Sequence, residues 1–388
     1  MTRLAYVCAD GGVPVFGNKG SSVHVQEMVR ALRAEGATVD IFATRFDGEA
    51  PEGLETVTVH ALPALPRGDL RVRERAAMAG NVALLARLQE TGPFDVVYER
   101  YSLWSHAGME HAERSAIPGI LEVNAPLIAE QSAHRGLHHV QEAEDAAARA
   151  FAAASALVAV SPGVAAYLQR QSAAQGRVHV IANGVDPERF YVVGRREPGD
   201  ALTVGFVGTL KPWHGLDVLV DAFVIALEAV PSLRLLVVGD GPERASVEGR
   251  IAAAGIVENV TFTGAVPPAA IPALLARMDI AVAPYPDLAD FYFSPLKLYE
   301  YMAAGLAVVA SRVGTIPRDL RDGREGMLYP PGSTGGLADA LLRLAADEPL
   351  RRRLGRAARA AVRRDHTWRG VARRTLAVAA RAREPAVL

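Results

Sequence analysis

Three lysines are the residues of this chain whose type and setting most suggest chemistry. The chain has 42 lysines and arginines, and subtracting the three lysines leaves 39 arginines. The lysines are Lys19 in GNKGSS, Lys211 in GTLKPWHG and Lys297 in SPLKLYE, each in a loop marked by glycine or proline. A lysine ammonium is a compact point charge and an arginine is a wide planar fork, so a pocket that needs a small cation beside a phosphate can prefer lysine. Loops are where charges normally lie, so the flanking residues must decide between this hypothesis and chance.

The first lysine lies in a glycine-rich segment, GGVPVFGNKGSS at residues 11–22, between a predicted strand and a helix that we expect to begin near Val23. Glycines allow backbone N–H groups to approach an anion, and a helix N-terminus adds a favourable dipole. Ser21 or Ser22 is a suitable N-cap. The segment lacks a strict G-x-G-x-x-G, so it favours contact with a phosphate or sugar over a dinucleotide site, and a plain connecting loop is the alternative.

The second lysine lies in a similar arrangement, FVGTLKPWHGLDVLVDAF at residues 206–223. The predicted strand ends at Gly208, the loop carries Lys211 and His214, and a helix is expected from near Gly215. Two potentially cationic side chains in one strand-end loop suit the neutralisation of a leaving diphosphate. The alternative for His214 is a polar residue at a helix start.

The third lysine belongs to the most specific stretch, APYPDLADFYFSPLKLYEYMAAGLAVVAS at residues 283–311. A strand ends near Pro284, and a helix can start at Pro295. The first free amides of that helix, near Leu296 and Lys297, would hold a phosphate. Glu300 lies one turn further, where its carboxylate would accept two hydrogen bonds from a vicinal diol such as a ribose. A solvated helix position is the alternative for Glu300.

Strand–helix alternation runs through the whole chain and predicts doubly wound parallel sheets in the α/β class. The predicted strands cover residues 4–9, 39–44, 56–61, 94–99, 119–123, 156–160, 178–181, 202–207, 233–238, 260–263, 280–284 and 307–310. The turn segment NGVDPERF, at residues 183–190, precedes a polar stretch and a new strand. We therefore expect Rossmann-like domains at residues 1–190 and 201–365, with ligands outside the carboxyl ends of the strands and the site in an interdomain cleft.

Composition excludes several classes of protein. Half of the residues are hydrophobic and the net charge is −1, which argues for a globular chain and against nucleic-acid binding by bulk electrostatics. The single cysteine, Cys8, excludes an internal disulfide and a cysteine-built metal cluster. No apolar stretch is long enough for a signal peptide or a membrane span, so we expect a cytoplasmic protein.

Taken together, these motifs resemble the retaining glycosyltransferases of family 4, which have the GT-B fold of two facing Rossmann-like domains. The resemblance covers nearly the whole chain. The segments that carry it are GSSVHVQEMVRAL, IANGVDPERF, FVGTLKPWHGLDVLVDAF, VVGDGPER, ENVTFTGAVPPAAIPALLARMDIAVAPY, SPLKLYEYMAAGLAVVAS and HTWRGVARR. In such proteins the last helix typically crosses back to the first domain, which here places residues from about 368 to 388 on the N-terminal half.

The resemblance implies transfer of a sugar from a nucleotide diphosphate sugar, UDP- or GDP-linked, with retention at the anomeric carbon. The C-terminal domain would hold the nucleotide and the N-terminal domain the acceptor, with no metal and no cofactor. The donor-binding residues would be Gly20, Ser21, Gly208, Thr209, Ser294, Pro295, Leu296, Lys297 and Glu300. The residues expected near the acceptor are His24, Arg100 and Glu122. Arg100 and Glu122 lie at predicted strand ends, where a side chain can point into the cleft or make a structural hydrogen bond, and the sequence favours neither alternative.

Four positions depart from the family pattern. Tyr292 stands where the family has the first glutamate of its pair, eight positions before Glu300. Thr209 and His214 replace an arginine and a lysine, with Lys211 between them, and Asn124 replaces a histidine. We expect Lys211, His214 and Asn124 to form the catalytic group, with Lys211 and His214 sharing the charge-stabilising role in a front-face displacement.

Two other functions compete with transfer. A nucleotide-sugar 2-epimerase of the same fold would need donor but no acceptor, and a non-catalytic sensor would bind nucleotide sugar without turnover. The acceptor could be a small metabolite, a glycan or a lipid-linked intermediate. Residues 67–89 form a candidate amphipathic helix with Arg71, Arg73, Arg75 and Arg87, for which a solvated face is favoured over contact with a membrane.

Overall fold

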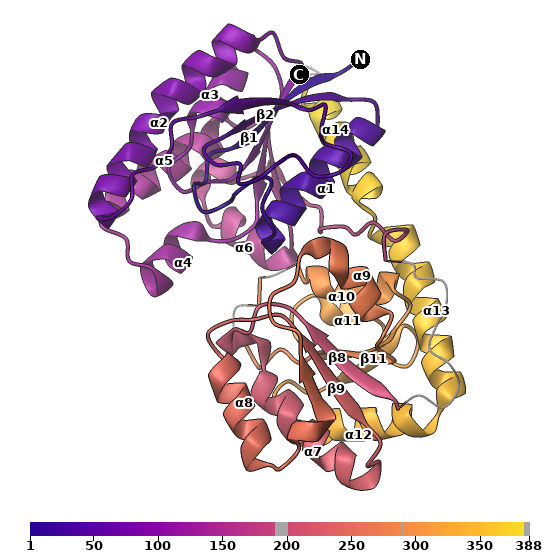
Figure 1. Cartoon of the computed structure of the whole chain (residues 1–388). Helices are drawn as coiled ribbons and strands as arrows, with labels where there is room; N and C mark the ends of the chain where they lie inside the picture. Colours follow the sequence, from indigo (N-terminus) through magenta and orange to yellow (C-terminus); the bar gives the residue numbers. More distant parts are fainter. Residues whose placement is uncertain (191–200, 289–290, 293, 384–388) are drawn as a thin grey trace. The chain divides into compact units, whose positions relative to one another are not determined.

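The computed structural model of this chain describes residues 1–190, 201–288, 291–292 and 294–383. The chain divides into two compact units (Figure 1). The first unit contains Met1–Asn183, Tyr292–Ser294 and Trp368–Leu388, and the second contains Gly184–Phe291 and Pro295–Thr367. Each unit is built around its own parallel sheet.

The first unit has a seven-stranded sheet. Its strands are β1 (Arg3–Cys8), β2 (Thr38–Ala43), β3 (Thr58–Ala61), β4 (Val96–Arg100), β5 (Gly119–Val123), β6 (Ala156–Ala159) and β7 (Val178–Val180). Their order across the sheet is β3-β2-β1-β4-β5-β6-β7 and the neighbouring strands run parallel. The order reverses between β1 and β4, which is the switch point where doubly wound sheets bind ligands.

The second unit repeats this order with six strands. They are β8 (Thr203–Val207), β9 (Arg234–Val238), β10 (Val260–Phe262), β11 (Ile280–Ala283), β12 (Ala307–Ser311) and β13 (Gly326–Tyr329). The order is β10-β9-β8-β11-β12-β13, again parallel, so its switch point lies between β8 and β11.

Helices connect the strands in both units. In the first unit they are α1 (Gly20–Ala34), α2 (Leu70–Thr91), α3 (Ala107–Arg114), α4 (Leu127–His134), α5 (Val140–Ala153), α6 (Pro162–Gln169) and α14 (Trp368–Arg383). In the second they are α7 (Leu216–Ala229), α8 (Arg244–Ala253), α9 (Ile271–Leu275), α10 (Leu296–Ala303), α11 (Ile316–Asp319), α12 (Thr334–Ala346) and α13 (Glu348–Asp365).

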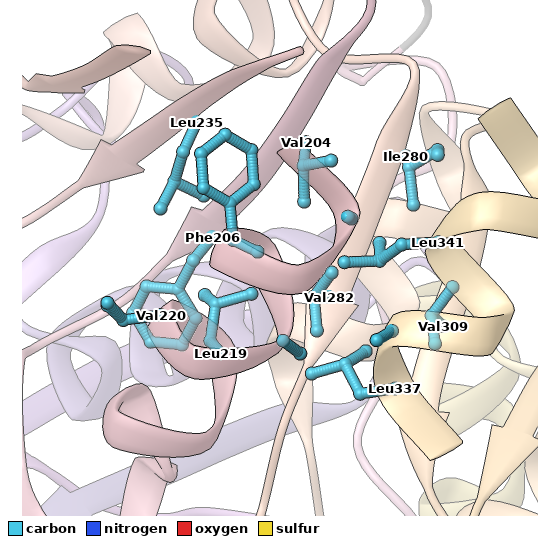
Figure 2. Close-up of a cluster of buried hydrophobic side chains, with 14 of the residues drawn as sticks. Val204, Phe206, Leu219, Val220, Leu235, Ile280, Val282, Val309, Leu337 and Leu341 are labelled. Atoms are coloured by element: carbon cyan, nitrogen blue, oxygen red, sulfur yellow. The ribbon is translucent and has the colours of Figure 1, made fainter. Parts of the chain in front are cut away.

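Apolar strands and helix faces build the core of each unit. In the second unit, Phe206 of β8 and Val282 of β11 are fully buried and face side chains of α7 and α12, among them Leu219 and Leu341 (Figure 2). Strands that are buried on both faces have continuous apolar sequences, which is why they can be recognised in the sequence. The two sheets therefore give rigid edges from which the site loops extend.

The predicted strands agree closely with the structure. Each of the twelve is present, with ends that differ by at most two residues. The prediction missed β13, because this four-residue edge strand is only half-buried at its centre and so has no continuous apolar run. The prediction that a helix begins near Val23 was wrong, since α1 begins at Gly20 with Lys19 as its N-cap residue.

Two segments distant in sequence complete the units. Residues 184–190, which we expected in the first domain, group with the second unit, where Val185 bridges Thr367 and the Pro187 carbonyl accepts a hydrogen bond from Arg359. Helix α14 lies beside α1 in the first unit, and Arg369 and Arg373 both pair with Glu35. Within the described residues, no helix is both long enough and apolar enough to cross a membrane.

Candidate active site

The loops that follow β8 and β11 meet at the switch point of the second unit. The His214 ring lies 5.8 Å from the Tyr285 ring, measured between centroids. Gly215 has a φ of 61°, and a side chain there would collide with the Pro284 carbonyl oxygen. Only glycine satisfies both conditions without strain. Gly215 therefore allows the short 3₁₀ turn Pro212–His214 to pack directly against the end of β11.

Lys297 places a buried ammonium at this switch point. Its Nζ lies 4.2 Å from the centre of the Phe206 ring and 5.4 Å from that of Tyr285. The residue is half-buried, but Nζ itself is buried and has no hydrogen-bond partner among the described residues. Burial lowers the pKa of Lys297 to about 7, against the opposing attraction of Glu300. The cation is thus held by aromatic faces and attraction at longer range, without a hydrogen-bond acceptor.

Lys297 lies beside a glycine and in the first turn of a helix. Gly208 has a φ of 148°, and a Cβ there would lie 2.9 Å from Lys297 Nζ, so glycine allows the close approach. Helix α10 begins at Leu296, and its N-cap residue Pro295 offers no side-chain acceptor to the first amides. Glu300 is half-buried on the same helix. The residues expected to bind the donor phosphates and ribose are therefore grouped in the second unit, apart from Gly20, Ser21 and Ser294, which belong to the first.

His214 differs from the expectation. Burial, together with the nearby charges of Lys297 and Lys211, lowers the pKa of His214 to about 3. Nδ1 lies 2.5 Å from the Thr209 carbonyl oxygen, which can only accept, so Nδ1 carries the proton and Nε2 keeps its lone pair. The imidazole is neutral at pH 7 in this structure. It cannot share positive charge with Lys211, whose Nζ lies 5.6 Å from the centre of the Trp213 ring.

In the first unit, the start of α1 contains two of the residues expected near the diphosphate. Gly20 is the first residue of the helix and Ser21 the second, and Lys19 makes no side-chain hydrogen bond to the helix start. A side chain at Gly20 would meet only open space. Ser21 is half-buried and Gly20 is exposed, so the amides of this turn are accessible from solvent.

The residues expected near the acceptor form a buried charged cluster instead of a lining. His24 Nε2 lies 3.1 Å from Glu122 Oε1 and 3.0 Å from Asn183 Oδ1. Arg100 NH1 lies 3.7 Å from Glu122 Oε2, to which Asn124 also donates a hydrogen bond of 3.1 Å. Both His24 and Glu122 are 2% exposed. Their polar atoms are therefore used mainly by one another.

Glu122 shows how strongly this cluster is paired. Burial by itself raises the pKa of a carboxyl, but the neighbouring His24, Arg100 and Asn124 outweigh it and hold the pKa of Glu122 at about 2. The carboxylate is therefore ionised over the whole physiological range. Asn124, expected in the catalytic group, uses its amide N–H on this carboxylate.

Tyr292, which stands where the family has a glutamate, contacts the first unit. Its hydroxyl donates to Glu130 on α4, and its carbonyl accepts a 2.6 Å hydrogen bond from Ser161 Oγ. Ser294 Oγ accepts a 3.2 Å hydrogen bond from the Asn183 amide. Both residues group with the first unit, whereas Pro295 begins the return to the second.

The first unit also contains a cavity of about 410 Å³ that no sequence motif predicted. It opens at the switch point of that sheet, because the segment after β1 and the segment after β4 both line it. The lining includes Asp10, Leu65, Leu70, Arg73, Leu103, Trp104, Leu127, Glu130 and Arg135. The available signal was the strand end YERYS, whose following residues 102–105 form one wall.

Two family models match the chain in succession. The model described as "Glycosyltransferase Family 4" matches residues 18–189, and the one described as "Glycosyl transferases group 1" matches residues 201–347. The two matches together span most of both units.

Relatives and solved structures agree with these matches. D-inositol 3-phosphate glycosyltransferase from Stackebrandtia nassauensis is 31% identical over 86% of this chain and 81% of its own length. Phosphatidyl-myo-inositol mannosyltransferase from Mycobacterium leprae is 38% identical over 45% of this chain and 46% of its own length. Sucrose-phosphate synthase from Thermosynechococcus elongatus shares the fold with a TM-score of 0.76 at 22% identity, covering 98% of this chain and 99% of its own.

Two parallel α/β units with the same strand order, each with its site residues at the carboxyl edge, define the GT-B class. This chain belongs to family 4 of the glycosyltransferases and is a glycosyltransferase.

Proposed function

We propose that this glycosyltransferase transfers a hexosyl group from a nucleotide diphosphate sugar with retention at the anomeric carbon. The observation that carries the proposal is the Lys297 ammonium, which is buried at the switch point of the second unit without a hydrogen-bond partner among the described residues. A buried cation costs free energy unless an anion compensates it, and a diphosphate supplies that anion. The free amides at the start of α10 would add to the same attraction.

The proposed step is a front-face displacement. The bond between the anomeric carbon and the diphosphate oxygen breaks, and the acceptor oxygen forms its bond to that carbon on the same face. The acceptor's proton passes to the leaving diphosphate oxygen. Lys297, Lys211 and the α10 amides would stabilise the negative charge that develops on the diphosphate.

The other residues take supporting roles in this proposal. Glu300 would accept hydrogen bonds from the ribose diol, one turn beyond the phosphate-binding amides. The neutral His214 would accept a hydrogen bond at Nε2 from a hydroxyl of the donor sugar, which replaces the cationic role expected from the sequence. Gly20 and Ser21 would contribute amides from α1.

We assign a positioning role to the buried cluster of the first unit. His24, Arg100 and Glu122 satisfy one another's polar atoms, so we propose that they fix the ends of β4 and β5 instead of binding the acceptor directly. Asn124 would share this role through its hydrogen bond to Glu122. Neutralisation of the diphosphate by lysine and amides requires no metal in this scheme.

A ligand screen tests the donor assignment. The thermal midpoint would be measured with UDP, GDP, ADP and their sugar conjugates, in the presence of a chelator and without added metal. We expect one nucleoside diphosphate, with UDP or GDP the first candidates, to raise the midpoint selectively, because it binds the folded state alone. A folded sample that responds to none of these ligands would contradict the donor site.

Lys211→Ala tests the charge-stabilising role directly. We expect kcat at saturating donor to fall by about 10²-fold, because one stabilising donor is lost in the transition state. Arg277→Ala, in the same unit but not proposed for the site, serves as the control. An unchanged kcat for Lys211→Ala would remove this residue from the mechanism and leave Lys297 as the cation.

A further inference from the structure

The cavity of the first unit has the size of a small-molecule site. Its volume of about 410 Å³ lies within the range of ligand pockets. It lies at the carboxyl edge between β1 and β4, where a doubly wound sheet places ligands. None of the buried cluster residues His24, Arg100 and Glu122 line it. It is therefore a site separate from the residues that the sequence suggested for the acceptor.

Two attachments hold the outer wall of the cavity against α2. Glu74 of α2 is buried and accepts hydrogen bonds from the amides of His138 and His139, and its Oε2 lies 2.7 Å from His139 Nδ1. Gly136 lies against Leu70, since a side chain at Gly136 would contact the Leu70 methyl at 3.4 Å. The segment after α4 is thus fixed over the start of α2, which gives the cavity a preformed shape.

Apolar side chains that are not fully buried dominate this wall. Four leucines and a tryptophan are half-buried there: Leu65, Leu70, Leu103, Leu127 and Trp104. These side chains come from four different segments of the chain, so it is the fold that brings them together around the cavity. Leucine surface left in contact with water is unfavourable, and a ligand with an apolar body would cover it. A small sugar or polyol has less apolar surface than such a ligand, so it would cover these side chains less completely.

Two arginines at the wall of the cavity can bind an anionic group on the same ligand. The side chains of Arg73 and Arg135 are exposed at the wall and form no ion pair or hydrogen bond with any of the residues that the structure describes. The carboxylates that also line the cavity each have a partner: Asp10 accepts from the Gly12 amide, Glu130 from Tyr292, and Glu74 from the residues named above. The two arginine side chains are therefore the charged groups with unused donors.

From these observations we infer that the acceptor is a hydroxylated molecule with an apolar body and an anionic group, bound in the cavity between α2, α4 and the β1/β4 edge. The inference rests on the proposed function, because it names the acceptor of that same reaction. The leucines and Trp104 bind the apolar body, and Arg73 and Arg135 bind the anion at the wall.

Three probes separate these contributions in calorimetric titrations of the full chain. Hydroxynaphthoate has the hydroxyl, the apolar body and the anion, naphthol lacks the anion, and inositol phosphate lacks the apolar body. We expect hydroxynaphthoate to bind at least about 10-fold more tightly than either of the others, since each loses one type of contact. Equal or tighter binding of inositol phosphate would overturn the inference.

Matched variants test the contacts to the anionic group and to the apolar body separately. Arg73→Met should weaken hydroxynaphthoate about 10-fold and leave naphthol unchanged, while Arg75→Met, on the same helix but outside the cavity, should change neither. Leu103→Asn should weaken both naphthyl probes, with Val82→Asn, 76% exposed on α2, as its control. Unchanged thermal midpoints would show that these variants fold. Equal effects of Arg73→Met and Arg75→Met would contradict the anion site.

Two further measurements identify the source of the acceptor and distinguish a failure of this inference from a failure of the proposed donor site. If phosphatidylglycerol vesicles displace hydroxynaphthoate, the acceptor is a lipid. If they do not, the acceptor is a soluble molecule. Both results support an acceptor with an apolar body and an anionic group. Nucleotide binding is measured in parallel. A protein that binds nucleotide but prefers inositol phosphate overturns this inference alone, whereas one that binds hydroxynaphthoate but no nucleotide overturns the proposed donor site alone.

Discussion

Each unit buries an ionisable side chain near the carboxyl edge of its sheet, but the two side chains have opposite surroundings. Lys297 Nζ has no hydrogen-bond partner among the described residues and contacts aromatic faces. Glu122 has His24, Arg100 and Asn124 around its carboxylate. Burial lowers the pKa of Lys297 to about 7, whereas its partners hold the pKa of Glu122 at about 2 despite burial.

This difference separates a binding group from a structural one. A buried charge that its neighbours fully satisfy gains little from a ligand, because its interactions are already made. A buried charge without such partners gains an interaction when an anion arrives. Four substitutions test this comparison.

Glu122→Gln should produce the largest effect, a loss of about 3–5 kcal/mol in the stability of the first unit, because it leaves the buried His24 and the half-buried Arg100 without their anion. Hydrogen exchange of the β5 amides measures that loss. In the wild type the contribution of Glu122 is present above pH 4.5 and is lost as pH falls toward 2, because its folded-state pKa is depressed.

The control for this variant is Glu90→Gln, which removes an exposed carboxylate beside Arg87 and should have little effect on stability. Nucleotide affinity should change little in Glu122→Gln. A large loss of nucleotide binding with unchanged hydrogen exchange would reverse the comparison.

Lys297→Met should lower kcat by about 10²–10³-fold, which corresponds to about 3–4 kcal/mol, without destabilising the second unit. Because burial depresses the pKa of Lys297 to about 7 and a diphosphate raises it again, binding at pH 8 should take up close to one proton. Calorimetry in two buffers of different ionisation enthalpy measures this uptake. Uptake that persists in Lys297→Met would assign the proton to another group.

Glu99→Gln should raise stability by about 2–3 kcal/mol at pH 8. Burial, partly opposed by a hydrogen bond from Ser105, raises the pKa of Glu99 to about 7, so the folded state favours the protonated form. The wild type therefore loses stability as pH rises from 4.5 to 7, the opposite sign to Glu122 on the neighbouring strand. Denaturation of both proteins at pH 5 and pH 8 measures this change in the free energy of unfolding. If the free energy of unfolding changes equally with pH in wild type and variant, Glu99 is not the source.

Gly208→Ala should have the smallest effect, a loss of about 10-fold in nucleotide affinity. A Cβ there would lie 2.9 Å from Lys297 Nζ, and the φ of 148° is strained for alanine. Gly249→Ala is a suitable control because a side chain at that helical position meets open space. If the two variants bind nucleotide equally, the position of Lys297 does not depend on Gly208.

The family and the candidate donor-site residues could be predicted from the sequence because they depend on local patterns. Apolar runs predicted twelve strands, and the segment around Lys297 and Glu300 predicted the helix that begins at Leu296. Pro295 cannot continue a strand ladder but can begin a helix, so this single residue marks the start of the helix.

The charge states and the acceptor cavity depended on tertiary structure. His214 looked like a cation in sequence, but its burial among Phe206, Tyr285 and two lysines leaves it neutral. From the sequence, Glu122 could either face a ligand or make a structural hydrogen bond, and β5 and α1 bring it within 3.1 Å of His24. Protonation and pairing depend on distances that no local pattern encodes.

The sequence by itself determined the fold class, the family and the position of the lysines near helix starts, because each follows from local periodicity and turn chemistry. Tertiary structure decided which of those polar side chains remain available to a ligand. It also brought four separate apolar segments together around one cavity in the first unit, since only the packing of α2 and α4 against the sheet edge places them in contact with the same space.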